Sequence, residues 1–349
     1  MVEHEHGGNI YKYRNCLDFS TNLNPLGPPE RVKQAVIQSL DHLQDYPQTG
    51  YEPLREAIGA YEGVLRDCVI CGNGAAELIY TLCQAIRPKK ALLPAPTFAE
   101  YGHALESVGC EITYFPMLPE DEYQLTGKFS EALYEEPDIV FLCNPNNPTG
   151  LLIPEEVLRQ IVEICEKRDI WLVVDECFLD FVRDQKRHTL KKDLRTHQNL
   201  FLLKAFTKRY AIAGIRLGYG LCGNQELLKK MRTKVQPWNI SCMAMAAGIA
   251  ALKETEYVEA GRQIVFRERE YLQEALRKLG LKVFPSQANY LFFEGPEGFF
   301  EACVKQGILI RDCSNYHGLG SGFYRIAVRK HEENLALVQA FQKICGKSL

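Results

Sequence analysis

Four short, unbroken apolar runs most constrain what this chain can fold into. They cover residues 69–71, 91–93, 139–143 and 170–174, and helix-like segments separate them. Strands that are buried on both faces have this continuous apolar pattern, because helices cover both sides of a parallel sheet. The alternation of such strands with helices predicts an α/β domain with a largely parallel sheet.

The segment after Pro154 indicates how these strands are connected. Proline is favoured at the first turn of a helix, where its missing N–H costs nothing. The apolar residues that follow share one stripe at helical spacing: Val157, Leu158, Ile161, Val162 and Cys165. We therefore predict a crossover helix that packs on the sheet.

The pattern changes after about residue 250. A long charged helix is predicted over 254–279, ending at Gly280, which suits the left-handed position that follows a helix. Strands are predicted over 288–293, 307–311 and 323–329. A closing helix is predicted from Leu337, Phe341 and Ile344. These elements indicate a second, smaller α+β domain.

Composition and charge restrict the partners of the chain. It has 349 residues, 46% of them hydrophobic, with 41 Lys and Arg against 44 Asp and Glu and a formal net charge of -3. A chain of this size can bury a sizeable core. Because there is no basic surplus to neutralise a phosphate backbone, we expect a small-molecule ligand and no nucleic acid.

Targeting segments are not expected from this sequence. Residues 1–8 are polar and carry no apolar core, which argues against a signal or transit peptide. The longest mostly apolar stretch, residues 243–252, is far shorter than the roughly 20 residues of a membrane-spanning helix. We expect a cytoplasmic protein with no membrane partner.

The 13 cysteines are odd in number and scattered from Cys16 to Cys345, mostly inside apolar runs. Reduced core thiols are the interpretation that this pattern favours. Cys68 and Cys71 form a lone CxxC, and a structural zinc ion needs four ligands. We expect no metal.

Ligands of open α/β sheets bind beyond the carboxyl ends of the strands, so the residues after each apolar run are candidates for the site. Gly72-Asn73-Gly74-Ala75-Ala76 follows the first run and leads into a helix, an arrangement that can hold an anion. Two nucleotide motifs do not fit, because Glu77 replaces the third glycine of GxGxxG and no GxxxxGK[ST] occurs. The loop alone is compatible with phosphate binding or with a tight turn.

The other strand exits also carry polar residues. Residues 144–150 are mostly turn formers, and Asp175 directly follows an apolar strand, where a carboxylate needs a cation or a hydrogen-bond donor. Lys208 follows a further run, and Arg216 comes eight residues later. An amine, a carboxylate, a phosphate-binding loop and an arginine are the components of a pyridoxal phosphate site. In such a site the amine binds the cofactor aldehyde and the carboxylate keeps the pyridine nitrogen protonated.

On these residues the sequence resembles the fold-type I aminotransferase superfamily of pyridoxal phosphate enzymes over essentially its whole length. Asn147-Pro148-Thr149-Gly150, Asp175 and Lys208 with Arg216 occur in the expected order and spacing. The resemblance implies a large domain, residues 41–253, with a mostly parallel seven-stranded sheet. A smaller α+β domain would cover residues 254–349, and residues 1–40 would contribute to it and to the active site.

The resemblance also implies roles for individual residues. Lys208 is the catalytic residue that binds the cofactor aldehyde, Asp175 binds the ring nitrogen and Asn147 the phenolic oxygen, while Phe98 stacks on the ring. The phosphate group is held by Gly74, Ala75, Ala76, Thr207 and Arg216. Tyr46 resembles a tyrosine that reaches the phosphate from the neighbouring subunit, which implies a homodimer with shared active sites.

Two residues depart from the pattern of the superfamily. Ala205 stands where a hydroxyl residue is usual three positions before the lysine, so one hydrogen bond to the phosphate is missing. Phe178 stands where a tyrosine is usual three positions after the aspartate, so the cofactor oxygen loses a donor.

The substrate residues that the resemblance implies are two arginines and two polar side chains near the start of the chain. Arg325 would grip the substrate α-carboxylate, and Arg311 a second, phosphate group. His6 and Asn22 would add contacts to that phosphate. A surface cation is the alternative for Arg311, and a solvated terminal side chain is the alternative for His6.

Within the superfamily the sequence is most similar to the branch of threonine-phosphate decarboxylases of cobalamin biosynthesis, which are relatives of histidinol-phosphate aminotransferases. The motifs are His6-Gly7-Gly8-Asn9, residues 18–27, residues 98–102, Pro237-Trp238, residues 308–311 and residues 324–327. Phe178 fits this branch, since histidinol-phosphate enzymes typically have tyrosine there.

The expected reaction is the decarboxylation of L-threonine O-3-phosphate to (R)-1-aminopropan-2-yl phosphate. The alternatives are a decarboxylase of O-phosphoserine, an aminotransferase for histidinol phosphate or a related amino acid, a non-catalytic pyridoxal-binding sensor, and a nicotinamide dehydrogenase. Glu77 weakens the dehydrogenase, and the sensor would need a DNA-binding domain ahead of Asp18.

Overall fold

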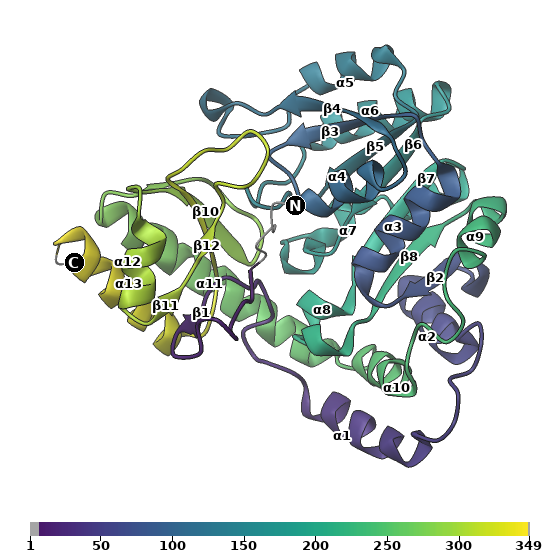
Figure 1. Cartoon of the computed structure of the whole chain (residues 1–349), viewed down its shortest axis with the longest axis horizontal. Helices are drawn as coiled ribbons and strands as arrows, with labels where there is room; N and C mark the ends of the chain where they lie inside the picture. Colours follow the sequence, from purple (N-terminus) through teal and green to yellow (C-terminus); the bar gives the residue numbers. More distant parts are fainter. Residues whose placement is uncertain (1–6, 348–349) are drawn as a thin grey trace.

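The centre of the molecule is a seven-stranded sheet in a computed structural model that describes residues 7–347 (Figure 1). Its strand order is β2-β8-β7-β6-β5-β3-β4. Strand β8 runs antiparallel to both neighbours and the other pairs are parallel. The predicted α/β fold with a mostly parallel sheet is confirmed. The strands are β2 (Val69–Gly72), β3 (Lys90–Ala95), β4 (Glu111–Pro116), β5 (Ile139–Cys143), β6 (Trp171–Asp175), β7 (Leu200–Ala205) and β8 (Gly218–Cys222).

Helices cover both faces of this sheet because successive side chains of each strand point to opposite sides. In β5, for example, Phe141 packs in the apolar cluster with α3, α4 and α9, whereas Val140 and Leu142 pack in the cluster with α2, α5, α6 and α10. The first group of helices is α3 (Gly74–Ile86), α4 (Ala99–Glu106) and α9 (Gln225–Arg232). The second group is α2 (Glu52–Glu62), α5 (Lys128–Ala132), α6 (Glu155–Lys167) and α10 (Cys242–Ala251).

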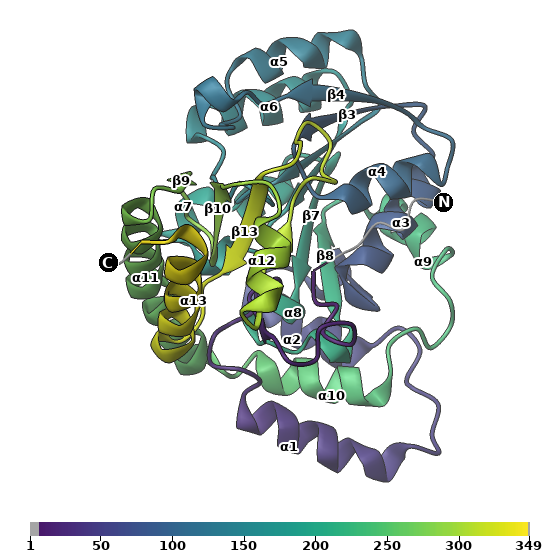
Figure 2. The same ribbon diagram turned by 60° about the vertical axis from the view of Figure 1, so that its left-hand side comes forward.

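Helix α6 is the crossover helix that the stripe after Pro154 predicts. Pro154 caps its N-terminus, and Leu158, Ile161 and Val162 are buried against the sheet. Helix α1 (Glu30–Ser39) lies beside α10 at the lower edge of the molecule in both views (Figures 1 and 2). Two short helices follow β6 and β7, namely α7 (Gln185–His188) and α8 (Phe206–Arg209). Short 3-10 turns cover Leu40–His42, Arg66–Cys68, Pro119–Asp121, Leu133–Glu135, Leu179–Phe181, Lys191–Arg195 and Ala213–Ile215.

The C-terminal part, at the left in Figure 1, is built on a four-stranded antiparallel sheet of order β12-β13-β10-β9. Helices α11 and α13 share an apolar core with it, and α11 ends before Gly280, whose φ is +85°. The strands are β9 (Lys282–Val283), β10 (Tyr290–Glu294), β12 (Arg311–Asp312) and β13 (Phe323–Ala327). The helices are α11 (Thr255–Lys278), α12 (Phe299–Lys305) and α13 (His331–Cys345).

The prediction of one strand over 307–311 is wrong. The segment divides at the buried Ile310 into β11 (Ile308–Leu309) and β12, which belong to different sheets. Strand β11 pairs in parallel with β1 (Leu17–Asp18), while Arg311 pairs with β13. The hydrophobic pattern does not reveal this change of partner, because each half is extended and buried.

The segment after β1 connects the C-terminal part to the large sheet. The backbone of Phe19 forms hydrogen bonds on both sides. Its N–H donates to the Leu309 carbonyl, and its own carbonyl accepts from the Ala327 N–H at 2.8 Å. The Asn24 N–H then donates to the Lys208 carbonyl at 2.9 Å. Residues 20–24 therefore lie between the two sheets, beside the carboxyl ends of the strands of the large sheet.

Within residues 7–347, no helix is long and apolar enough to cross a membrane, and no cluster of three or more His, Cys, Asp or Glu could hold a metal ion. The two cysteines of the CxxC lie in different elements, Cys68 in a 3-10 turn and Cys71 in β2, and both are free thiols.

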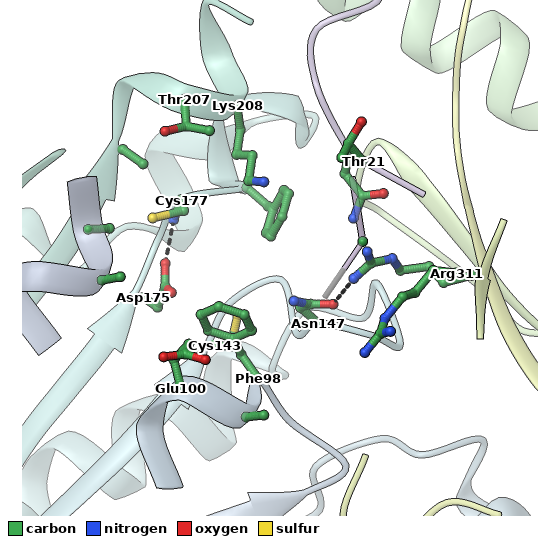
Figure 3. A pocket seen from close by; sticks show the side chains of 18 of the residues that line it. Thr21, Phe98, Glu100, Cys143, Asn147, Asp175, Cys177, Thr207, Lys208 and Arg311 are labelled. Atoms are coloured by element: carbon green, nitrogen blue, oxygen red, sulfur yellow. Dashed lines mark hydrogen bonds between the residues drawn. The ribbon is translucent and has the colours of Figure 1, made fainter. Parts of the chain in front are cut away.

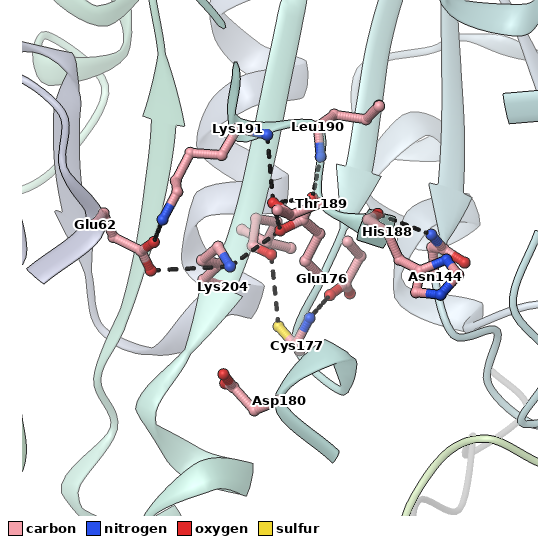
Figure 4. A network of polar contacts seen from close by, with 12 residues as sticks. Glu62, Asn144, Glu176, Cys177, Asp180, His188, Thr189, Leu190, Lys191 and Lys204 are labelled. Atoms are coloured by element: carbon pink, nitrogen blue, oxygen red, sulfur yellow. Dashed lines mark hydrogen bonds and ion pairs between the residues drawn. The ribbon is translucent and has the colours of Figure 1, made fainter. Parts of the chain in front are cut away.

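A buried network of charges lies on the face of β7 that carries Lys204 (Figure 4). The Lys204 Nζ is 3.0 Å from a Glu176 carboxylate oxygen and 3.8 Å from one of Glu62. Lys191 donates to Glu62 at 2.8 Å. Burial favours the neutral form of Glu62, but the Lys204 and Lys191 cations outweigh it and lower the pKa of Glu62 to about 2. The network thereby ties α2, β7 and the end of β6 together.

Replacing Lys204 should test how much this network stabilises the fold. In Lys204→Met the buried Glu176 carboxylate keeps, among the described residues, the Thr189 hydroxyl and the Leu190 N–H as partners. The free energy of unfolding should fall by about 3 to 5 kcal/mol, as for a buried ion pair that loses one partner. Urea denaturation measures it. The matched control is Lys167→Met on α6, where the side chain is 75% exposed and a change within about 0.5 kcal/mol is expected. A similar small loss in both variants would contradict the role of the network.

Candidate active site

A pocket lies beyond the carboxyl ends of β5, β6 and β7, and the C-terminal part closes its other side (Figure 3). Most residues predicted from the sequence meet there: Asn22, Ala75, Ala76, Phe98, Asn147, Asp175, Thr207, Lys208, Arg216, Arg311 and Arg325 line the pocket. Gly74 lies against Arg216 at its edge. His6 lies outside the residues that the structure describes. The structure thus brings together side chains that are up to about three hundred residues apart in sequence.

Asp175, the last residue of β6, is a fully buried carboxylate that is held on both oxygens. One oxygen accepts from the Cys177 N–H at 2.9 Å, and the other accepts from the Tyr101 hydroxyl at 2.7 Å. Burial raises the pKa of the Asp175 carboxyl in spite of these hydrogen bonds. A carboxylate in this setting is stabilised by a cation that enters the pocket, such as a protonated pyridine nitrogen.

Lys208 lies in α8, directly after β7, and its amine enters the same pocket. Burial, followed by the nearby positive charge of Arg325, lowers the pKa of Lys208 to about 8. A substantial fraction of the amine is therefore neutral near physiological pH. A neutral amine is the form that attacks a carbonyl carbon.

The N-terminus of α3 lies at the pocket beside Arg216. Gly74 opens this helix with φ +81°, and a Cβ there would overlap the guanidinium of Arg216. A Cβ on Gly218 would likewise overlap the Ala75 nitrogen, so glycine allows β8 to approach the helix end. Free N–H groups at a helix N-terminus together with an arginine suit a phosphate group. Thr207, on the pocket wall, adds a hydroxyl.

Asn147 is buried in the loop after β5, and its carbonyl oxygen is occupied by other side chains. That oxygen accepts from Arg325 Nη1 and, at 3.3 Å, from the Tyr316 hydroxyl. The amide nitrogen points to the interior of the pocket, toward the Phe98 ring (Figure 3). The amide is therefore oriented to donate to a ligand oxygen, and Phe98 offers a ring face for stacking.

Arg311 and Arg325 form a pair of buried cations at the far wall of the pocket. They lie directly opposite each other on β12 and β13, where like charges repel. Arg325 donates to the Ser20 carbonyl at 3.0 Å and Arg311 to Asn315 at 2.7 Å. Within residues 7–347, neither guanidinium forms an ion pair with a carboxylate. Two such cations favour a ligand with two anionic groups.

Two buried polar atoms near these arginines have no hydrogen-bond partner among the described residues. They are Nε of Arg325 and the side-chain oxygen of Asn22, both in side chains that line the pocket. An unpaired buried polar atom is costly. Both atoms are consistent with a polar ligand that completes the wall.

Several residues that line the pocket or contact its lining were not predicted to have a role. Tyr101 follows Phe98 by one helical turn, and Cys177 follows Asp175 by two residues, so spacing could have indicated both. Cys143 ends β5 and points into the pocket. Asn315 and Tyr316 come from the loop between β12 and β13, whose position no sequence periodicity specifies.

Ala205 and Phe178, which depart from the superfamily pattern, lie in the pocket, whereas Tyr46 lies outside it. Ala205 and Phe178 line the pocket, and the Phe178 ring lies 5.7 Å from the Lys208 amine. Tyr46 is 79% exposed, contacts the Trp238 ring at an interplanar angle of 32° and does not line the pocket of its own chain. Its predicted role toward a second copy stays a prediction.

The residues present fit pyridoxal phosphate. The pocket offers an amine of lowered pKa for the aldehyde, a buried carboxylate for the ring nitrogen, an amide for the phenolic oxygen, an aromatic face, and a helix N-terminus beside Arg216 for the phosphate. This combination, beyond the strand ends of a mostly parallel seven-stranded sheet, defines a fold-type I pyridoxal phosphate enzyme.

The chain belongs to the aminotransferase class I and II family, whose model matches residues 14–341. This family uses pyridoxal phosphate, as the pocket indicates. The chain is 36% identical over 351 residues to a threonine-phosphate decarboxylase of Salmonella typhimurium, covering 97% of this chain and 96% of the relative. It is 33% identical over 344 residues to a histidinol-phosphate aminotransferase of Methanosarcina mazei, covering 95% and 89%.

Among solved structures, the chain is similar to the histidinol-phosphate aminotransferase of Clostridium acetobutylicum. The TM-score is 0.89 at 30% identity, and the alignment covers 95% of this chain and 99% of the other. The predicted superfamily and cofactor are therefore confirmed, and the relatives carry two different activities.

The pKa of Lys208 gives a test that needs no cofactor. In the apoprotein, acetylation of Lys208 by acetic anhydride across a pH series should be half-maximal near pH 8, because burial and Arg325 lower the pKa. Nα-acetyl-lysine, with an ordinary pKa of about 10.4, is the reference. Peptide mass spectrometry measures the labelling. Arg325→Gln should move the midpoint upward because it removes a nearby cation, and an unchanged midpoint in that variant would contradict the proposed electrostatic cause.

Proposed function

We propose that this protein is a pyridoxal-phosphate-dependent carbon–carbon lyase that decarboxylates L-threonine O-3-phosphate to (R)-1-aminopropan-2-yl phosphate. The product is the phosphorylated aminopropanol of the cobalamin side chain. The observation that carries the proposal is the pair of buried arginines, Arg311 and Arg325, which share the pocket with Lys208 and lack a carboxylate partner among the described residues. A phosphorylated amino acid supplies one anion for each, and the similarity to the Salmonella decarboxylase agrees with this substrate.

Each pocket residue then has a role in the reaction. When bound, pyridoxal phosphate supplies a ring that withdraws the electron pair of the bond that breaks at the substrate Cα. Asp175 holds a proton on the ring nitrogen, and Asn147 donates to the phenolic oxygen. The N-terminus of α3, with Thr207 and Arg216, holds the cofactor phosphate.

The substrate is held by the opposite wall. Arg325 binds the α-carboxylate and Arg311 the phosphate, with Asn22 beside them; His6 is proposed for the same phosphate. Holding both ends of the substrate would fix the orientation of its Cα, and with it which bond at Cα the cofactor would weaken. Carbon dioxide leaves, and Lys208, whose pKa of about 8 allows both protonation states, delivers the proton that replaces it at Cα.

A histidinol-phosphate aminotransferase is the second candidate, favoured by the similarity to the Clostridium structure. Lys208, Asp175 and the phosphate site would serve it equally. Histidinol phosphate has a phosphate but no carboxylate, so it leaves one of the two arginines without an anionic partner, whereas the two carboxylates of 2-oxoglutarate, the amino-group acceptor, would pair with both. Phe178 also places no hydroxyl beside the Lys208 amine. A decarboxylase of O-phosphoserine differs from the proposed enzyme by one substrate methyl group only.

The proposal includes a homodimer with shared active sites, to which Tyr46 contributes the contact with the cofactor phosphate of the neighbouring subunit. Tyr46 and Trp238 form an exposed aromatic pair with ring centroids 4.6 Å apart. Exposed apolar residues lie nearby in the sequence on and after α1: Ile37, Leu40 and Leu43. Exposed apolar groups of this kind favour an interface with another chain.

The reaction itself is tested by measuring both products. Holoenzyme incubated with O-phospho-L-threonine should release carbon dioxide in step with (R)-1-aminopropan-2-yl phosphate and form no keto acid. O-phospho-L-serine is the matched substrate for the role of the methyl group. Transfer of the amino group from histidinol phosphate to 2-oxoglutarate, without carbon dioxide from phosphothreonine, would establish the second candidate instead.

Replacing Arg311 and replacing Arg325 should have different effects on substrate selectivity. Arg311→Ala should abolish the preference for phosphothreonine over threonine, whereas Arg325→Ala should impair both substrates alike, because both have the α-carboxylate. Each loss should amount to roughly 2 to 5 kcal/mol of transition-state binding, as kcat/KM reports. Arg277→Ala, an exposed position of α11, is the control. Equal loss of selectivity in the two variants would contradict the assignment of the two anionic groups.

A further inference from the structure

The loop between β12 and β13 crosses from the C-terminal part to the large sheet. Within it, the Tyr316 N–H donates to the Cys313 carbonyl at 3.0 Å. The His317 ring stacks on the Tyr114 ring of β4, with centroids 3.8 Å apart and an interplanar angle of 17°. Tyr316 is therefore fixed from both sides, between residues anchored to one sheet and residues stacked on the other.

The hydroxyl of Tyr316 connects the carboxylate-binding arginine to the cofactor-facing amide. Tyr316 is buried, donates to the Asn147 oxygen at 3.3 Å and accepts from Arg325 Nη1 at 3.3 Å. Arg325 Nη1 also donates to the same Asn147 oxygen. The three groups thus form a closed set of hydrogen bonds, so the position of each depends on the other two.

The ring of Tyr316 and the preceding side chain hold the other arginine. The guanidinium carbon of Arg311 lies 5.5 Å from the centre of the Tyr316 ring, within the range of a cation–π interaction. Arg311 Nη2 donates to the Asn315 oxygen at 2.7 Å. Two consecutive loop residues therefore position Arg311.

This arrangement counteracts the electrostatic repulsion between Arg311 and Arg325. Arg311 and Arg325 are Cα partners in the register of β12 and β13, and like charges directly opposite each other destabilise a sheet. Tyr316 contacts one guanidinium with its ring and the other with its hydroxyl. The two cations are thereby kept at separate places in the pocket, which sets the distance between the two anions that they can bind.

We propose that Tyr316 is a positioning residue that holds Arg311 and Arg325 at the spacing of a phosphorylated amino acid. The Tyr316 hydroxyl fixes the positions of the Arg325 and Asn147 side chains. The Tyr316 ring, together with Asn315, fixes the position of the Arg311 side chain. The identity of the two anions rests on the proposed function, whereas the link from the hydroxyl to Asn147 does not.

Two variants separate the two halves of this inference. Tyr316→Phe keeps the ring and removes the hydroxyl. The pH midpoint of the visible absorption of the holoenzyme should rise by about half a pH unit, because a less firmly held Asn147 stabilises the phenolic oxygen less. Its kcat/KM should fall about fivefold for phosphothreonine and for threonine alike, so that selectivity is retained.

Asn315→Ala should give the opposite pattern. The absorption midpoint should stay at the wild-type value, and kcat/KM should fall about fivefold for phosphothreonine only. The matched control for a lost buried hydroxyl is Tyr123→Phe, whose ring packs on Phe284, Phe292 and Phe323 outside the pocket lining. It should match the wild type in both measurements.

The outcomes separate this inference from the proposed function. A wild-type midpoint together with wild-type kcat/KM in Tyr316→Phe would overturn the inference, and so would a loss of selectivity in Tyr316→Phe without one in Asn315→Ala. If the wild-type enzyme releases no carbon dioxide from phosphothreonine, the proposed function fails. The absorption midpoint of Tyr316→Phe then still tests the link from the hydroxyl to Asn147, since it requires no substrate.

Discussion

The buried ion pair between Lys204 and Glu176 is the constraint on which the geometry of the pocket depends. Lys204 lies on β7 and Glu176 directly after β6, and the two strands are paired in parallel with Asp175 opposite Leu203. Because neighbouring residues at a strand end point to opposite sides, fixing Glu176 behind the sheet leaves Asp175 facing the pocket. Lys208 follows Lys204 by four residues, in the short helix α8 directly after β7. The ion pair that holds Lys204 therefore also helps to fix the position of the Lys208 amine. One contact outside the pocket thus positions both groups that the cofactor needs.

Charge, more than shape, then determines what the pocket accepts. Lys208, Arg216, Arg311 and Arg325 line it against the carboxylate of Asp175, with Glu100 at the edge. The excess of positive charge in the pocket affects Lys208. Its pKa is lowered to about 8, first by burial and next by the Arg325 cation. Anionic groups at Arg216, Arg311 and Arg325 would offset the excess of positive charge, and in the proposed function a cofactor phosphate and a doubly anionic substrate would supply three. In the ligand-free pocket the Lys208 amine therefore loses its proton more readily than an ordinary lysine does.

The sequence predicts the large sheet and the cofactor site better than the C-terminal part. Runs such as 139–143 are apolar on both faces, a pattern that only a covered strand explains, and the strand ends then place Asp175 and Lys208 at one edge. The two-residue strands β11 and β12 carry no such signal, because the chain changes partner at a single buried residue, Ile310. Tyr316 is beyond prediction for a related reason. Its contacts depend on where a ten-residue loop crosses between two sheets, and nothing in its local sequence encodes that crossing.

The proposed roles divide between the two parts of the pocket. The residues assigned to the cofactor, such as Lys208 and Asp175, stand on the large sheet, and they would make any bond at Cα easier to break without choosing among them. The choice would depend on how the substrate is held, and Arg311 and Arg325 of the C-terminal part, which are strand partners in the pocket wall, are proposed to hold it. Moving one of these guanidiniums relative to the other would then reorient the substrate while leaving Lys208 and Asp175 in place. The loop that carries Asn315 and Tyr316 touches both guanidiniums and the large sheet, so changes in this loop can alter the reaction without disturbing the cofactor site.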